Sequence, residues 1–526
     1  MKNKSVAIIG SGLSAVSAAK ALISRGVKPV ILDVGEEIEE DRKNLILKLS
    51  KISHKNWLDL DRERITNNDT VNNFSTLKKL AFGSDYFYSN KASIRSGQKD
   101  TFIIPPSTHA AGGFSVAWGA ASLLPDDSDL TEWPISRSDL LKYYEYAMED
   151  IAISSESDDL NFFSPILAAN QCQSKASTEA TDLLDRLNHS YKHDPRILFG
   201  KARLLVNFDQ SKASGCRYCG CCMSGCVYGA IYTSGDDLKK LVKEGKVEYR
   251  PGIEVVKLVE IGESIKIIAK NKSNNNLEES MIVNKVFMGA GVINSTRIVM
   301  ESKNYFENKV TLKTTSSFVV PILKFKRTEI QWPETNTMPS VFIEIKNQKL
   351  GDHWMHCQIS SPNELVLNKM KINFKNIRSY FSRLKKYFLG YFIVAHCNIH
   401  SNYGVSYNFF MSHNKKLCFS KNDSRNASLA IKSALYELKK IFNKINYFPL
   451  TMIAKSSINN ISYHQGCTMP MKFLPTNDMD TDILGRPKGF KNLHIIDSSI
   501  FPSLPATSIG VVAMVNAYRI AKEADF

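Results

Sequence analysis

The sequence predicts an α/β protein in which a Rossmann-like domain is joined to an α+β domain. A glycine-rich turn lies between two apolar runs at the N-terminus, and a second strand–glycine–helix pattern occupies 284–302. The C-terminal segment returns to the same pattern. With 526 residues, the chain is also too long for one compact core, so two joined domains are expected.

The first predicted element is a βαβ unit. An apolar run at Val6–Ile9 predicts a strand, a helical pattern follows the glycine turn, and a second apolar run at Pro29–Leu32 ends in Asp33. This order is the dinucleotide-binding fingerprint, in which the acid accepts a ribose hydroxyl and the turn approaches a pyrophosphate. The alternative is a glycine turn with a purely structural role. The turn residues predicted to contact the dinucleotide are Gly10, Gly12, Leu13, Ser14 and Ala15.

Helices and strands continue through the first predicted domain. Apolar spacing predicts a helix within 36–60 and a serine-capped helix within 133–154. Residues 155–195 are expected to be mostly helical. Alternation around a glycine predicts strands over 247–270, and 284–302 has the pattern of a strand, a glycine turn and a helix.

A change of pattern marks the second domain, which is predicted at 311–460. Short strand-like runs there are separated by polar loops, and helical patterns lie near 370–390 and 424–445. Because the tail returns to strand, turn and helix, we predict a discontinuous first domain over 1–310 and 461–526. The second domain is inserted before the tail.

The net charge of +16 raises the question of anionic partners. Nucleic acid, a membrane surface and an acidic substrate all fit such a charge, and so does an ordinary basic surface. No nucleic-acid-binding motif is present, so no nucleic-acid partner is expected. Residues 1–4 lead directly into the first strand, and no apolar stretch reaches membrane-spanning length. We therefore expect a cytoplasmic protein, with membrane association at the inner face as an open alternative.

Four separated stretches resemble the glucose–methanol–choline (GMC) family of FAD-dependent oxidoreductases. GSGLSA with ILDVGEE is similar to the opening strand pair, and AGGFSVAWGAASLLP to the flavin-covering glycine segment. VFMGAGVINSTRIVMES resembles the strand–GAG–helix element, and the tail from SYHQGCTMPM onward resembles the C-terminal block. The chain looks nearest to bacterial sugar and alcohol dehydrogenases with a Cys-rich segment. The resemblance implies a Rossmann-like FAD-binding domain and an α+β substrate-binding domain.

The resemblance also implies FAD as the cofactor. Some relatives attach FAD covalently through a His at the position that is Ala117 here, so non-covalent FAD is expected. The GAG turn would allow close approach on the adenine side, and the helix beginning near Thr507 or Ser508 would direct its positive N-terminus at the flavin. The implied contacts outside the first turn are Asp33, Gly112, Gly113, Ser115, Trp118, Gly119, Val255, Ala290, Gly291, Asp497, Ser498 and Ile509.

His464 matches the position of the family's catalytic base. The resemblance implies that the flavin takes a hydride from an alcohol while this His takes the hydroxyl proton, a task that suits a neutral imidazole. Six residues after Pro502, where the family usually has His or Asn, this chain has Ser508. A serine can hydrogen-bond a substrate oxygen but cannot act as a base, which puts an ordinary alcohol substrate in question.

The predicted function is oxidation of a hydroxyl group, on a sugar or glycan-like alcohol, by a dehydrogenase rather than an oxidase. The expected partners are the small-molecule substrate and a protein or quinone electron acceptor. Two alternatives remain open. One is a flavin-dependent isomerase or epimerase that acts by transient redox, and the other is a non-catalytic electron-transfer flavoprotein.

Five of the ten cysteines lie within 216–226. Cys216, Cys219, Cys222 and Cys226 follow the ferredoxin-type spacing C-x2-C-x2-C-x3-C, although Val227 replaces the usual proline. In a chain without an export signal this clustering favours metal or redox chemistry. Three interpretations remain open: an iron–sulfur cluster, structural zinc, or unligated cysteines.

Residues 370–390 combine basic and aromatic side chains at helical spacing. This pattern is typical of an amphipathic helix. It fits peripheral contact with an anionic membrane, and it also fits a surface helix packed against the second domain.

Overall fold

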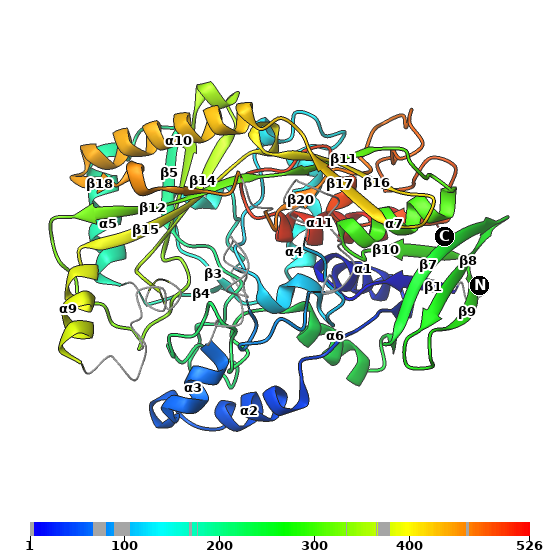
Figure 1. Ribbon diagram of the computed structural model, residues 1–526, viewed down its shortest axis with the longest axis horizontal. Coiled ribbons are helices and arrows are strands. Elements are labelled where there is room, and N and C mark those ends of the chain that lie inside the picture. The colour runs from blue at the N-terminus through cyan, green and yellow to red at the C-terminus, as the bar shows by residue number, and fades with distance from the viewer. Residues whose placement is uncertain are drawn as a thin grey trace.

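The computed structural model describes residues 5–66, 80–88, 106–167, 171–175, 177–332, 334–363, 366, 379–458 and 462–525. Figure 1 shows two parts side by side. One contains both chain ends and the N-terminal helix, and the other contains a large antiparallel sheet with one long helix across it. The predicted α/β class is confirmed, since one sheet is parallel and the others are mainly antiparallel.

The first part is built on a parallel sheet. Its order, β21-β10-β1-β2-β6, places the N-terminal strand at the centre, between strands from the middle and the end of the chain. All four pairings are parallel. Continuous apolar runs suit such strands because both faces are covered. The strands are β1 (Val6–Ile9), β2 (Val30–Leu32), β6 (Glu248–Arg250), β10 (Lys285–Met288) and β21 (Leu493–Ile495).

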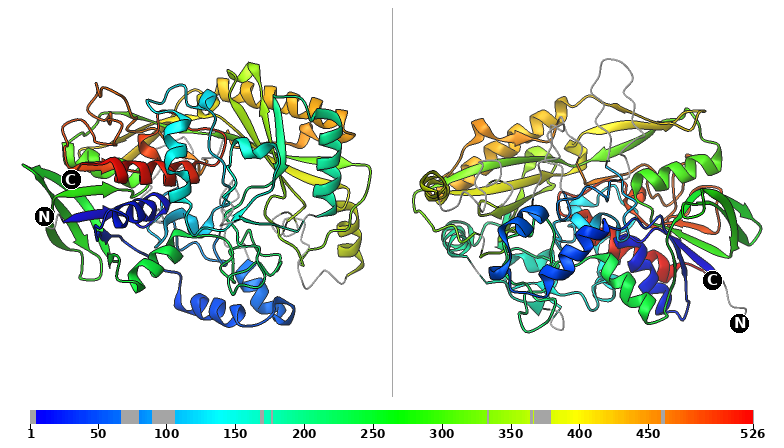
Figure 2. Two further views of the ribbon diagram at one scale, coloured as in Figure 1. Left: turned by 180° about the vertical axis from the view of Figure 1, so that it is seen from behind. Right: turned by 60° about the horizontal axis from the view of Figure 1, so that its bottom comes forward.

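Helices and a small antiparallel sheet surround this parallel sheet. The N-terminal and C-terminal helices lie together: the Ser17 hydroxyl donates to the Met514 carbonyl at 2.7 Å. Figure 2 shows them from behind, alongside α4. The helices are α1 (Leu13–Ile23), α4 (Arg137–Ala147), α6 (Ser234–Lys243), α7 (Val292–Lys303) and α11 (Ile509–Glu523). The small sheet contains β7 (Ile253–Ile261), β8 (Ser264–Asn271) and β9 (Leu277–Val283).

The second part is a seven-stranded antiparallel sheet. Its order is β18-β12-β15-β14-β13-β5, and β19 also pairs with β12. Alternate residues of these strands form an apolar core with two helices, α5 (Thr178–Tyr191) and α10 (Arg425–Lys444). The strands are β5 (Ile197–Lys201), β12 (Ser316–Lys324), β13 (Val341–Lys346), β14 (Trp354–Ser360), β15 (Phe392–Ile399), β18 (Tyr447–Pro449) and β19 (Lys455–Ser456). Because α5 and β5 precede residue 311, the chain enters this layer twice.

A four-stranded sheet connects the two parts. Its order is β17-β16-β11-β20. Strand β11 (Val310–Thr314) leads almost directly into β12, and β20 (Gln465–Gly466) follows the turn that carries the candidate base. The connection therefore brings the C-terminal block to the edge of the large sheet. The remaining strands are β16 (Ser406–Met411) and β17 (Leu417–Lys421).

Shorter elements complete the described chain. Helices α2 (Glu40–Ser50) and α3 (Asp59–Thr66) extend from one side, and α9 (Tyr380–Leu389) lies at the far end of the large sheet (Figure 1). Strands β3 (Ile153–Ser154) and β4 (Gln171–Cys172) form a short parallel pair. In the described ranges, no helix combines the length and hydropathy needed to cross a membrane. The part of the predicted amphipathic helix at 370–378 lies outside the described residues.

The helix predicted within 133–154 is confirmed as α4. Ser136 and Asp139 form a capping box at its start. The prediction that 155–195 is mostly helical is wrong for most of the described residues before α5. That segment contains β4 and a single 3₁₀ turn at Asp159–Phe162, and the rest is irregular.

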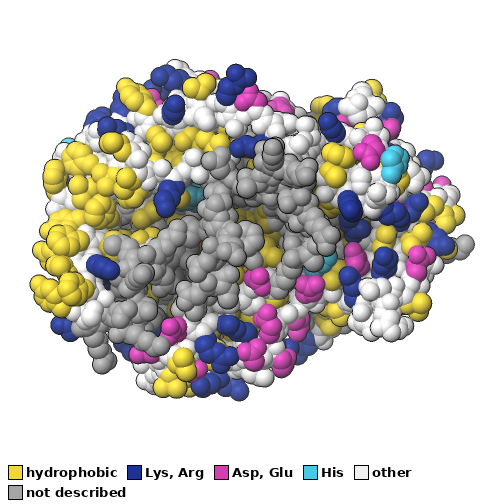
Figure 3. Space-filling view, viewed as in Figure 1, with side chains coloured by type: hydrophobic (Ala, Val, Ile, Leu, Met, Phe, Trp, Pro, Cys, Tyr) yellow, Lys and Arg dark blue, Asp and Glu magenta, His cyan; other side chains and the backbone are white. Residues whose placement is uncertain are grey.

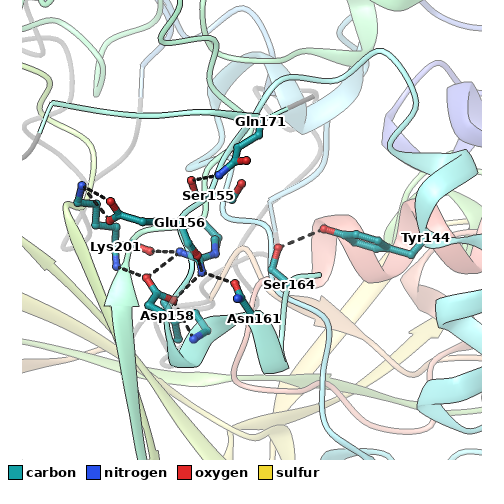
Figure 4. Close-up of polar contacts among 10 residues, drawn as sticks. Tyr144, Ser155, Glu156, Asp158, Asn161, Ser164, Gln171 and Lys201 are labelled. Carbon is teal, nitrogen blue, oxygen red and sulfur yellow. Dashed lines mark hydrogen bonds and ion pairs between the residues drawn. The ribbon is translucent and has the colours of Figure 1, made fainter. Parts of the chain in front are cut away.

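The physical reason is a buried arginine just after β5. The Arg203 guanidinium, 0% exposed, contacts the Asp158 carboxylate at 2.5 Å and the Glu156 carbonyl at 2.6 Å. It also donates to Asn161 Oδ1 at 3.0 Å. Figure 4 shows Glu156, Asp158, Asn161 and Lys201 close to one another. The segment therefore directs its polar groups at Arg203, an arrangement that a regular helix would prevent.

A candidate flavin and active site

Two glycine turns of the parallel sheet lie against each other. Gly10 has φ +95°, and a β-carbon there would lie 2.5 Å from the Gly289 carbonyl oxygen. A β-carbon on Gly289 would in turn lie 3.3 Å from the Ala15 amide nitrogen. The predicted N-terminal turn and the GAG turn are thus one unit. Only glycine combines this φ with such a close backbone approach.

A third glycine segment joins them. A β-carbon on Gly113 would lie 3.0 Å from Gly12 Cα. The Ser11 hydroxyl accepts from the Gly112 amide at 2.9 Å, and the Ser234 hydroxyl donates to the Gly112 carbonyl at 2.9 Å. The residues predicted as a flavin-covering segment therefore pack on the start of α1. Ser11 and Ser234 were not predicted from the sequence, where isolated serines carry no distinctive signal.

Asp33 follows β2 and is almost completely buried. Its carboxylate accepts from the Ser11 hydroxyl and, at 3.2 Å, from the Tyr249 hydroxyl. Burial raises the pKa of Asp33 to about 7, against the lowering effect of these hydrogen bonds. The Ile253 amide donates to the Asp33 carbonyl at 2.9 Å, so the start of β7, with Val255, lies beside this acid. The predicted ribose acceptor and Val255 therefore belong to one region.

The N-termini of two helices meet at Trp118. A β-carbon on Gly510, near the start of α11, would lie 2.7 Å from the Trp118 ring and 3.2 Å from Leu13 Cδ1. The Trp118 indole donates to the Tyr232 carbonyl at 2.7 Å. Ser115 is buried and donates to the Gly112 carbonyl at 2.6 Å, whereas Gly119 is exposed. Aligned N-termini supply positive partial charge, which suits the phosphates and electron-rich ring of a dinucleotide.

The C-terminal block contributes Asp497 and Ser498. The Asp497 carboxylate accepts from the Gly291 amide at 2.9 Å and from the Ser295 hydroxyl at 2.5 Å. Burial raises the pKa of Asp497, and these hydrogen bonds lower it in part. The Ser498 hydroxyl donates to the Gln465 carbonyl at 2.9 Å. Ala290–Gly291 and Asp497–Ser498, predicted as separate contacts, are thus adjacent, and His464 is one residue from Gln465.

His464 lies in a half-buried turn between the two parts of the molecule. Its carbonyl accepts from the Thr315 amide at 3.2 Å, and its amide donates to the Ser462 hydroxyl at 3.0 Å. Its Nδ1 is buried and has no hydrogen-bond partner among the residues that the structure describes. Burial, together with the charges of His396 and His356, lowers the pKa of His464 to about 4. The imidazole is therefore neutral at pH 7 and has a free ring nitrogen.

Ser508 is the N-cap of α11, directly before Ile509, and its side chain makes no capping hydrogen bond. The neighbouring Thr507 hydroxyl is buried and unpartnered. A β-carbon on Gly466 would lie 2.9 Å from Leu504 Cδ2. The turn that carries His464 therefore packs against the chain segment just before α11. Thr507 was not predicted, because a threonine beside a helix cap has no special signal in the sequence.

The four motif cysteines line one small cavity. Its walls include Cys216, Cys219, Cys222 and Cys226, and its volume is only about 10 Å³. Burial, with the neighbouring Cys226 and Cys219, raises the pKa of Cys216 to about 12. In the ranges that the structure describes, no group of three or more His, Cys, Asp or Glu side chains is arranged around a single metal ion. The described residues therefore support neither the iron–sulfur nor the zinc prediction.

The site fits a bound FAD by its chemistry. Glycine backbones approach one another at Gly10, Gly12 and Gly113, and a β-carbon on Gly291 would meet only open space. Two helix N-termini point to the same region, and the orphaned Thr507 hydroxyl lies at one of them. Such backbone cradles and helix starts are the features that bind dinucleotides in open α/β sheets.

Comparisons with known proteins address the fold. No model of a known protein family and no curated protein sequence matches the chain. Among solved structures, pyridoxine 4-oxidase from Mesorbium loti is similar with a TM-score of 0.59 and 12% identity, covering 99% of each chain. An FAD-dependent oxidoreductase from Chaetomium thermophilum, solved with a bound fragment, is similar with a TM-score of 0.58 and 11% identity, covering 99% of this chain and 98% of that one. This chain therefore has, over its whole length, a fold that is also found in flavin-dependent oxidoreductases.

Proposed function

We propose that this protein is an FAD-dependent oxidoreductase that oxidises a hydroxyl group of a sugar or glycan-like alcohol to a carbonyl. The observation that carries the proposal is the position of His464. A neutral imidazole with a free, buried Nδ1 lies one residue from the contact between Gln465 and Ser498. The proposed flavin-binding turns and the candidate base thus meet at Asp497–Ser498.

The chemistry divides between the cofactor and the chain. FAD, when bound, supplies the acceptor for the hydride that leaves the carbinol carbon. His464 accepts the hydroxyl proton through its neutral imidazole as the C–O bond becomes a carbonyl. Ser508 and Thr507 are proposed to hydrogen-bond the substrate oxygen, and the N-terminus of α11 favours negative charge at that end of the site. Gly10, Gly12, Asp33, Gly112 and Gly291 would hold the cofactor non-covalently.

The test is a comparison of the holoenzyme with His464→Asn under anaerobic conditions. The variant should retain FAD, because His464 belongs to the substrate side of the proposed site. Its rate of flavin reduction by substrate should fall by roughly 10²–10⁴-fold, the usual contribution of a positioned base. His413→Asn, on an exposed loop, is the matched control and should behave as the native protein. Equal reduction rates in all three proteins would refute the role of His464.

The same experiment separates the alternatives. A redox isomerase or epimerase would convert substrate anaerobically with no added acceptor and without net flavin bleaching. A non-catalytic electron-transfer flavoprotein would show no reduction by any alcohol but would accept electrons from a chemical donor.

We further propose an iron–sulfur cluster at the four motif cysteines. The support for this proposal is that the four cysteines have ferredoxin-type spacing and line the same small cavity. The segment leads within six residues to Tyr232, whose carbonyl accepts from the Trp118 indole. Cys216, Cys219, Cys222 and Cys226 would hold the cluster, which would supply one-electron transfer from the flavin region to an external acceptor.

Metal analysis of anaerobically purified protein tests this second proposal. Iron with a broad brown absorption is expected in the native protein and in Cys418→Ser, a control outside the motif. Both should be lost in Cys216→Ser. A native spectrum with flavin bands alone and no iron would overturn the cluster while leaving the proposed oxidoreductase intact.

A further inference from the structure

A row of polar side chains crosses the large sheet and begins beside His464. The Thr315 amide donates to the His464 carbonyl at 3.2 Å, and Ser317 lies two residues further along the same chain segment. Ser317 is the cross-strand partner of Asn398, Asn398 that of His356, and His356 that of Glu344. Cross-strand partners share a face, so these side chains lie opposite the apolar core formed by alternate residues such as Cys357 and Cys397.

The buried end of the row is a hydrogen-bonded His–Glu pair. His356 and Glu344 are both 0% exposed, and His356 Nδ1 lies 2.5 Å from Glu344 Oε1. The other ring nitrogen lies 3.0 Å from the Gln358 amide nitrogen. If the His356 Nδ1–H donates to the Glu344 carboxylate, Nε2 is left as an acceptor for the Gln358 amide N–H, and the orientation of that amide is fixed.

Gln358 and its cross-strand partner His396 are only half-buried, unlike the His–Glu pair behind them. His396 and His356 both lower the pKa of His464, so the three rings lie within electrostatic reach of one another. Asn398 has a buried, unpartnered amide nitrogen, and His464 has the unpartnered Nδ1. A buried polar atom without a partner loses its hydration with no compensating hydrogen bond, so a ligand that pairs with these atoms is favoured.

We propose that Gln358, His396 and Asn398 form a recognition wall for additional hydroxyl groups of the substrate, and that Glu344 and His356 are positioning residues for Gln358. Hydroxyl groups both donate and accept, which matches a wall that offers amide and imidazole groups. The substrate class is therefore a polyhydroxylated ring such as a pyranoside, in preference to a monohydric alcohol, which would leave the wall unpaired. This inference rests on the proposed oxidation at His464.

The test measures binding and reduction separately on the FAD-loaded protein. The probes are methyl gluco-, galacto- and mannopyranoside, with cyclohexanol as the monohydric comparison. Gln358→Leu should raise the Kd and the KM for a bound pyranoside by at least ~10-fold, leaving cyclohexanol unchanged. Glu344→Gln should raise the same KM with little change in FAD content. Gln348→Leu, an exposed glutamine outside the wall, is the control.

The outcomes distinguish this proposal from the proposed function. If pyranosides bind but reduce no flavin, oxidation fails while the wall survives. If the native protein binds no pyranoside, or if Gln358→Leu binds it as tightly as the native protein, the wall is overturned.

A second, independent observation concerns the far end of the large sheet. Large apolar side chains there are strongly exposed: Phe325, Tyr380 and Phe381 are each 74% exposed, and Phe388 is 56% exposed. Figure 3 shows hydrophobic side chains gathered at this end, where Figure 1 places α9 and β18. The aromatic side chains of α9 are therefore exposed, whereas Ser382 and Leu389 of the same helix are buried.

The exposed residues form one surface because their segments are joined. The Thr328 amide donates to the Gly390 carbonyl at 3.0 Å, and the Arg327 guanidinium lies 4.5 Å from the centre of the Tyr387 ring. Phe325 contacts Phe448 of β18 with ring centroids 5.0 Å apart. We call this the aromatic surface; it comprises segments 325–328, 379–391 and 447–453.

The aromatic surface is basic as well as apolar. Its three segments contain no Asp or Glu, and the cations on them are Lys326, Arg327, Arg383, Lys385 and Lys386. Aromatic side chains interleaved with cations are typical of proteins that lie on a bilayer, where the rings enter the headgroup region and the cations meet anionic lipids. Monomeric proteins rarely expose a contiguous apolar patch of this kind without a partner.

We also propose that the aromatic surface binds an anionic lipid bilayer. The test is co-sedimentation of the FAD-loaded full chain with phosphatidylcholine vesicles with and without phosphatidylglycerol. Binding should require phosphatidylglycerol and weaken at high salt, because Lys326, Arg327, Arg383 and Lys385 are exposed. Phe381→Ser/Phe388→Ser should weaken binding by roughly tenfold or more. Phe473→Ser, 78% exposed elsewhere, is the matched control and should bind as the native protein.

No binding of the native protein to either vesicle overturns the proposal. So does a Phe381→Ser/Phe388→Ser variant that binds as well as the native protein. A native dimer that becomes a monomer in this variant would show that a second copy of the chain covers the surface, and would also overturn it.

Discussion

Gly10 and Gly289 hold the N-terminal turn and the GAG turn in backbone contact, because a β-carbon on Gly10 would lie 2.5 Å from the Gly289 carbonyl oxygen. The two residues are far apart in the sequence but lie at the ends of the adjacent parallel strands β1 and β10. The proposed FAD-binding turns therefore depend on a backbone contact that leaves no room for a side chain at Gly10.

Gly10→Ala should lower both FAD affinity and stability. Positive φ alone costs an alanine about 1–2 kcal/mol, and the clash with Gly289 adds to this. Gly26→Ala is the matched control, since Gly26 also has positive φ but would meet no atom within 4 Å. Chemical denaturation and FAD titration should show a larger loss for Gly10→Ala. Equal losses in the two variants would show that the close approach has no energetic role.

Asp33 should make FAD binding depend on pH. Burial raises its pKa to about 7, so the apoprotein carries a protonated acid at pH 6 and a carboxylate at pH 8. A carboxylate is the stronger acceptor for ribose hydroxyls, so the Kd for FAD should fall as the pH rises through about 7. In Asp33→Asn the Kd should be roughly tenfold higher and should not vary over this range. A native Kd that is constant between pH 6 and 8 would contradict this role.

On the acid side, the rate of flavin reduction should fall only at a pH far below the usual pKa of histidine. Proton acceptance requires neutral His464, and burial with the nearby His396 and His356 lowers its pKa to about 4. The neutral form therefore persists as the pH falls from 7 to 5 and is lost only near pH 4. The rate of flavin reduction, followed anaerobically against pH, should show this limb. A limb near pH 6.5 would indicate an unperturbed histidine or a different base.

Arg203 should be essential for stability at the junction between β5 and the first domain. Its guanidinium is fully buried and contacts Asp158, Glu156 and Asn161 (Figure 4). Arg203→Met leaves these acceptors without their donor, and such losses cost about 3–5 kcal/mol. Arg196→Met removes only an exposed pair with Asp194 and should cost no more than about 1 kcal/mol. Denaturant midpoints that do not differ between the variants would show that the network is not needed.

The parallel sheet and its turns were predictable because their signals are local. Val6–Ile9 is a continuous apolar run, and the glycine turn and Asp33 follow at fixed spacing. The grouping of Ala290–Gly291 with Asp497–Ser498 required the resemblance, since nothing local relates these segments.

The recognition wall could not be predicted in the same way. Gln358 and His396 meet only because β14 and β15 pair in one particular register, which depends on strands far apart in the sequence. In the sequence, Gln358 and His396 each stand next to a buried cysteine, Cys357 or Cys397. This alternation of polar and apolar residues is typical of a strand with one polar face. The irregular path of residues 155–167 depends on Arg203, a residue that sequence patterns give no reason to place in the interior.

Anaerobic spectroscopy of the FAD-loaded protein is the decisive test of whether bound FAD oxidises a hydroxyl group with His464 as the base. Methyl pyranosides are added without an electron acceptor, and the flavin absorption is followed while the product is analysed for a carbonyl group. The proposed function predicts bleaching of the flavin with one carbonyl formed per flavin reduced, and loss of both in His464→Asn. A protein that binds no FAD, or a bound flavin that no hydroxylated substrate reduces, would contradict it.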